Sequence, residues 1–109
     1  MIVSEDQVET ALEYLGIDPH PLSLAWKDLT DAENEKDRVY AEIYKKQEGS
    51  IKDREMACER SEEVVRSRMA ISMSKCALER ARARIKWAEM IIEIFRTEAA
   101  TARIAERIR

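Results

Sequence analysis

Glycine and proline are scarce in this sequence, with two of each among 109 residues. Both residue types interrupt regular helices, so their scarcity excludes a chain broken into many short elements. Positions 51–109 contain neither of them. Charged residues make up 38% of the sequence, and alanine, glutamate and arginine are abundant, which favours long helices. We therefore expect an all-α fold without strands.

The sequence also lacks a long apolar run. No stretch approaches the roughly 18 apolar residues of a membrane-spanning helix, and residues 1–16 lack the basic and apolar regions of a signal peptide. Cys58 and Cys76 form no CxxC motif, and His20, the single histidine, lies between two prolines in a connector. We expect a cytoplasmic protein without membrane contact, and no catalytic residue, cofactor or metal ion.

The helical periodicity and the capping signals predict four helices, at about residues 4–15, 22–47, 51–59 and 61–107. These helices form one domain over residues 1–109, in which 1–21 is a short helix with a proline-containing connector and 22–109 is a helical hairpin.

Serines mark three of the predicted helix starts. Ser4 with Gln7 forms a capping box, and Ser50 and Ser61 precede the third and fourth helices. Thr30 followed by Glu33 is another capping-box pattern, so a break in the second helix near residue 30 is the main alternative.

Apolar residues recur along the fourth helix at steps of three, four or seven residues, with most large ones followed by a small one, which is typical of a coiled-coil-like seam. We call these eight positions the inner row: Ile71, Leu78, Ala81, Ile85, Ala88, Ile92, Phe95 and Ala99. Further apolar residues widen this stripe and require a third helix or a second subunit to cover them: Met69, Met73, Trp87, Ile91 and Ile94.

Helix lengths indicate how much of the seam one chain can cover. At about 1.5 Å per residue, a helix over 61–107 extends about 70 Å and one over 22–47 only about 39 Å. The short first helix adds cover for about two turns, which leaves much of the seam exposed. We therefore predict a homodimer or larger assembly with the inner row as the oligomer seam.

Charge is distributed unevenly along the chain. Residues 1–50 carry five Lys/Arg and twelve Asp/Glu, a net charge of −7, whereas residues 51–109 carry fourteen and ten, a net charge of +4. The basic residues most suited to contact nucleic acid are Arg66, Arg68, Lys75, Arg80, Arg82 and Arg84. We favour the alternative that these side chains pair with acids of the 28–48 segment.

Two segments carry a family resemblance. The pattern Arg54-Glu55, Ala57 and Ser61, followed by Trp87, Ile92-Glu93, Phe95-Arg96-Thr97 and Arg103, resembles an RExxA … IExWRxxxAxxR pattern. That pattern is typical of a family of small, mostly uncharacterised α-helical phage and prophage proteins. Phe95 departs from it, because the family has tryptophan there. The resemblance covers about residues 38–103 and implies a phage-encoded protein inside a bacterial host, without assigning active residues.

The leading hypothesis is a non-enzymatic helical binding or adaptor protein that associates with itself and with another phage or host protein. The first alternative is an accessory protein of phage DNA recombination that contacts nucleic acid through the basic residues of 66–86. The second alternative is an anti-defence inhibitor of a host complex, in which the acidic segment mimics nucleic acid.

Overall fold

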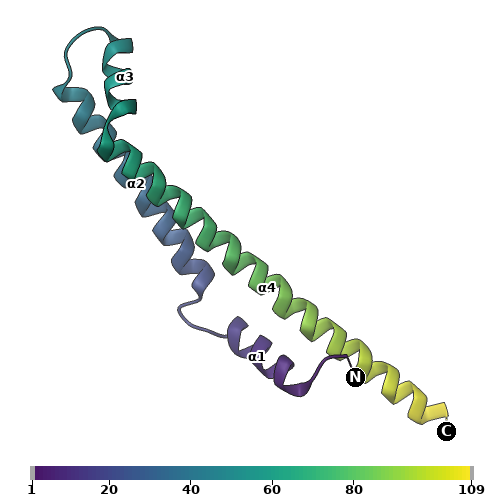
Figure 1. The fold of residues 1–109 in the computed structure, drawn as a ribbon. Coiled ribbons are helices and arrows are strands. Elements are labelled where there is room, and N and C mark those ends of the chain that lie inside the picture. Colours follow the sequence, from purple (N-terminus) through teal and green to yellow (C-terminus); the bar gives the residue numbers. More distant parts are fainter. Residues whose placement is uncertain (1, 109) are drawn as a thin grey trace. The chain divides into compact units, whose positions relative to one another are not determined.

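The computed structural model describes residues 2–108 and contains four helices, with no strand in that range. They are α1 (Glu5–Leu15), α2 (Pro21–Lys46), α3 (Ile51–Arg60) and α4 (Glu62–Ile108), shown in Figure 1. The all-α prediction is confirmed, and each predicted helix boundary lies within one residue of the observed one.

The start of α1 has the predicted capping box. The Ser4 hydroxyl accepts the Gln7 N–H at 3.2 Å, and the Gln7 side chain accepts the Ser4 N–H at 2.9 Å. Two backbone donors that the first helical turn leaves without an intrahelical acceptor are thereby satisfied. Pro21 occupies the first position of α2, where a missing N–H costs no hydrogen bond.

The turn between α2 and α3 depends on Gly49, whose φ of 111° is accessible to glycine at little cost. The Ser50 hydroxyl then accepts the Asp53 N–H at 3.2 Å and caps α3, as predicted. Ser61 has extended backbone angles, so it separates α3 from α4, and its carbonyl accepts the Val65 N–H at 3.0 Å. The predicted break at Ser61 is therefore confirmed.

The alternative break near residue 30 is wrong, because α2 is continuous from Pro21 to Lys46. The Thr30 hydroxyl does not cap a new helix. It donates to the carbonyl of Trp26, four residues earlier in the same helix, at 3.0 Å.

The chain divides into two compact units, and α4 contributes to both. Unit 1 comprises Met1–Pro21 and Arg80–Arg109, and unit 2 comprises Leu22–Glu79. The assignment of residues 1–109 to one domain stays a prediction.

Unit 1 is built on the packing of α1 against α4. Ala11 of α1 and Ala88 of α4 have no exposed surface, and Val3, Tyr14 and Ile91 are also buried in this cluster. Alanines at such a contact let two helix backbones approach closely. Around them pack the partly buried residues Val8, Leu15, Ile85, Trp87, Ile92, Ile94 and Phe95.

Tyr14 makes three contacts that fix α1 in unit 1. Its hydroxyl donates to the carbonyl of Ala81 at 3.3 Å. The guanidinium carbon of Arg84 lies 4.6 Å from the centre of its ring, and the His20 ring meets it edge-on with centroids 5.1 Å apart. His20 is therefore packed beside an aromatic ring at the end of the connector.

Unit 2 is a helical hairpin of α2 and the first part of α4. Ala25 and Leu29, near the start of α2, are buried with Leu78 of α4. Nearer the end of α2, the Tyr40 carbonyl accepts the thiol of Cys58 in α3, with 3.7 Å between sulfur and oxygen. Because the start of α2 meets the later part of this α4 segment, the two helices run antiparallel, in agreement with the predicted hairpin.

Three exposed charged residues of α2 form a local network in unit 2. Arg38 donates to Glu42 at 2.6 Å and to Glu35, three residues before it, through two nitrogens. These hydrogen bonds lower the pKa of Glu35 and raise the pKa of Arg38. Burial raises the pKa of the neighbouring Tyr40 phenol.

We predict that Tyr14→Phe lowers the free energy of unfolding by about 1 kcal/mol, the usual contribution of one hydrogen bond. Tyr14→Ala should cost about 3 to 5 kcal/mol, because it also removes the buried ring. Denaturant unfolding followed by circular dichroism measures both changes. Hydrogen exchange of residues 5–15 should accelerate more than that of residues 25–39 in unit 2. Equal acceleration in both segments would contradict a local role for Tyr14.

We predict that acid weakens the Glu35–Arg38 contact. Because the pKa of Glu35 is lower in the folded chain, its contribution to stability is present above its unfolded value of 4.5 and is lost as the pH falls through the folded value. When the pH is lowered from 7 to about 3, the melting temperature of Glu35→Gln should therefore fall by less than that of the wild type. Glu33→Gln, another exposed carboxylate of α2, is the control and should behave as wild type.

Candidate interaction surfaces of the long helix

The structure places the inner row on the covered side of α4. Leu78, Ala81 and Ala88 are buried, and the other five residues are half-buried: Ile71, Ile85, Ile92, Phe95 and Ala99. The expectation that much of this seam stays exposed is wrong for these eight residues. The role of the inner row as an oligomer seam stays a prediction.

The inner row is covered because α1 packs over more of α4 than the sequence indicated. In unit 2, Ile71 and Leu78 pack with α2. In unit 1, the α1 cluster includes residues from Ile85 to Phe95, which is about three helical turns rather than the two expected. Two helices of the same chain therefore occupy most of the face that the sequence analysis assigned to a second subunit.

A different face of α4 is open in unit 2. Val65, Met69 and Met73 follow one another at four-residue intervals, and 61% of Met69 and 73% of Met73 are exposed. Together with Arg68 and Ser72 they line a shallow groove. The sequence predicts a cover for Met69 and Met73, and the hairpin does not provide one. Trp87, Ile91 and Ile94, from the same group, pack in the α1 cluster instead.

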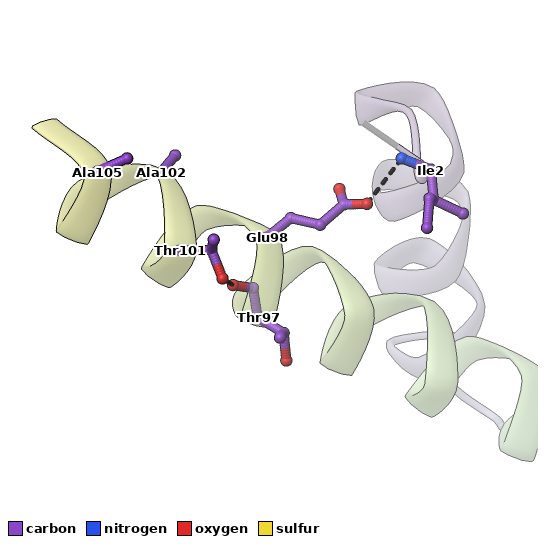
Figure 2. A pocket seen from close by; sticks show the side chains of 6 residues that line it. All are labelled: Ile2, Thr97, Glu98, Thr101, Ala102 and Ala105. Atoms are coloured by element: carbon purple, nitrogen blue, oxygen red, sulfur yellow. Dashed lines mark hydrogen bonds between the residues drawn. The ribbon is translucent and has the colours of Figure 1, made fainter.

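A second groove lies in unit 1 and is shown in Figure 2. It is lined by Ile2 and by residues of α4, most of them small, among them Thr97 and Thr101. The hydroxyls of these threonines donate to carbonyls of their own helix at 3.0 Å, so the single donor of each hydroxyl is already used. The groove therefore presents mainly apolar atoms.

Glu98 connects the two sides of this groove. One carboxylate oxygen accepts the backbone N–H of Ile2 at 2.7 Å, as Figure 2 shows. The other oxygen is buried without a hydrogen-bond partner among the described residues. The contact ties the residues before α1 to the later part of α4.

The basic residues proposed for nucleic-acid contact differ in their surroundings. Arg66 pairs with Glu62 at 3.0 Å, Arg68 pairs with Glu59 of α3, and Arg84 lies over the Tyr14 ring. For Arg66 and Arg68 the acidic partners thus lie on α4 and α3 rather than in the 28–48 segment. Arg82 also has an interaction within the chain, and Lys75 and Arg80 are exposed.

Two further findings concern the described residues. Between positions 2 and 108, no three His, Cys, Asp or Glu side chains are grouped so that they could hold a metal ion. In the same range, no helix combines the length and the apolar character needed to cross a membrane.

Comparison of the chain with protein-family models, with curated proteins and with solved structures gives no match. The resemblance to small phage proteins therefore stays a prediction.

We predict that the basic residues do not form a nucleic-acid site. A face that neutralises six phosphates loses about three orders of magnitude in affinity between about 50 and 200 mM salt. Because Arg66, Arg68 and Arg84 already have partners, titration of single- and double-stranded DNA should show no such dependence. Arg82→Glu should leave any weak binding unchanged. A steep loss of affinity with salt that Arg82→Glu reduces would contradict this prediction.

Proposed function

We propose that this chain is a non-enzymatic helical binding protein that associates with itself. Following the resemblance in its sequence, we propose that it is phage-encoded and acts in the bacterial cytoplasm as an adaptor for another phage or host protein. The observation that carries the proposal is the set of apolar side chains that α4 leaves exposed after α1 and α2 have packed against it.

These exposed side chains are large and recur along α4. In unit 2 they include Met69 and Met73, and in unit 1 they include Met90, Ile104 and Ile108, each more than half exposed. Burying one such side chain contributes about 1.5 to 3 kcal/mol, so several together can hold a protein partner. Contiguous apolar surface, such as that of Val65, Met69 and Met73 along the groove in unit 2, is typical of protein interaction sites.

The exposed surface also fits the chemistry of an adaptor better than that of a nucleic-acid binder. Methionine adapts its shape to different partners because its side chain is unbranched and flexible. Arg66 and Arg68, the charged residues beside the exposed methionines in unit 2, are already paired with glutamates. The favourable energy available on this face is therefore mainly that of apolar burial.

Light scattering coupled to size exclusion tests self-association. We expect the mass to rise from that of one chain, 12.7 kDa, toward twice that value or more as the protein concentration increases. A mass of one chain at every concentration up to the millimolar range would contradict the proposal.

A further inference from the structure

The part of α4 in unit 1 carries a second row of residues with coiled-coil spacing. Starting at Arg80, the steps are alternately three and four residues through Ile108. We call this set the outer row: Arg80, Ala83, Trp87, Met90, Ile94, Thr97, Thr101, Ile104 and Ile108. Eight of its nine members are apolar or threonine, over about four heptads.

The outer row lies across the helix from the inner row. Each outer-row residue from Ala83 to Thr101 follows an inner-row residue by two positions, which is about 200° around an α-helix. The inner row is covered by α1 in this unit, whereas Met90 is 53% and Ile104 57% exposed. Trp87 and Ile94 are half-buried, because one side of each contacts the α1 cluster.

We infer that the outer row from Arg80 to Thr97 is occupied by the same stretch of a second copy of this chain, with the two α4 helices antiparallel. This inference rests on the proposed self-association and specifies the surface and orientation. The stretch from Arg80 to Thr97 spans 18 residues, about two and a half heptads, and requires a partner helix of at least that length. A second copy of α4 meets that requirement.

The orientation follows from charge. In an antiparallel pair centred between Ala88 and Glu89, Arg80 lies opposite Thr97 of the second copy. Lys86, which flanks the row, then lies beside Glu93 of the second copy, and this pairing occurs twice by symmetry. A parallel, in-register pair would instead place Arg80 against Arg80 within the seam, and like charges at that position are unfavourable.

Side-chain size agrees with the same register. Ala83 lies opposite the larger Ile94 of the second copy, and Trp87 lies opposite the flexible Met90. Small residues facing large ones fill a helix interface without voids or overlap. The antiparallel register thus satisfies both charge and volume with residues of one sequence.

Cysteine crosslinking tests the register. In a Cys76→Ser background, which leaves only the buried Cys58, Arg80→Cys and Thr97→Cys are introduced singly and together. Both positions are exposed, and within one helix they are about 26 Å apart, too far for an internal disulfide. On oxidation, the double variant should form a covalent dimer and neither single variant should.

The outcomes separate this inference from the proposed function. Single variants that crosslink as readily as the double variant would establish a parallel pair and overturn the orientation. A double variant that does not crosslink, in a protein that light scattering shows to be dimeric, would place the contact elsewhere. A protein that remains one chain in light scattering would refute the proposed self-association itself.

A second variant pair tests the surface without crosslinking. Met90→Lys should raise the dimer dissociation constant by about tenfold or more, because two apolar side chains are lost from each dimer. Met56→Lys, an exposed methionine of α3, should leave that constant unchanged. Circular dichroism checks that both variants keep their helix content. Equal dissociation constants for the two variants would overturn the assignment of the surface.

Discussion

The packing of α1 against α4 in the buried cluster that includes Ala11 and Ala88 determines how much of α4 is covered in unit 1. A helix of 47 residues gains most of its stability from packing one apolar face, because isolated helices are only marginally stable in water. In unit 1 that face is covered by an eleven-residue helix, and two of the fully buried residues in the cluster between them, Ala11 and Ala88, are alanines. Tyr14 then fixes the position of α1 through Ala81, Arg84 and His20.

Charge contributes less to the fold than its uneven distribution along the sequence suggests. The described ion pairs are mainly local, such as Arg38 with Glu35 and Glu42 on α2, and their side chains are about half exposed. Exposed pairs of this kind add little stability because water and salt screen them. Apolar packing therefore holds each unit together.

Local signals in the sequence predicted the helices. They could not predict which segments pack against each face of a helix. Helix capping depends on contacts within a few residues of the sequence. The capping residues therefore located the helix starts, at Ser4 with Gln7, at Ser50 and at Ser61. Thr30 with Glu33 matched the same capping pattern, but α2 is continuous there, and the Thr30 hydroxyl donates to the Trp26 carbonyl of the same helix. Periodicity identified the inner row but carries no information on what covers it, since that depends on contacts between distant segments. The contact of His20 with Tyr14 also had no local signal.

In unit 1, α4 has one face packed against α1 and another that we propose is covered by a second chain. Oxidation by excess hydrogen peroxide measures this directly, because an exposed methionine is converted to its sulfoxide faster than a covered one. Met90, which is 53% exposed in the single chain, should be oxidised several-fold more slowly at high protein concentration than at low concentration, while Met56 of α3 should react at the same rate at both. Equal rates for Met90 at both concentrations, in a protein whose mass shows association, would contradict the account.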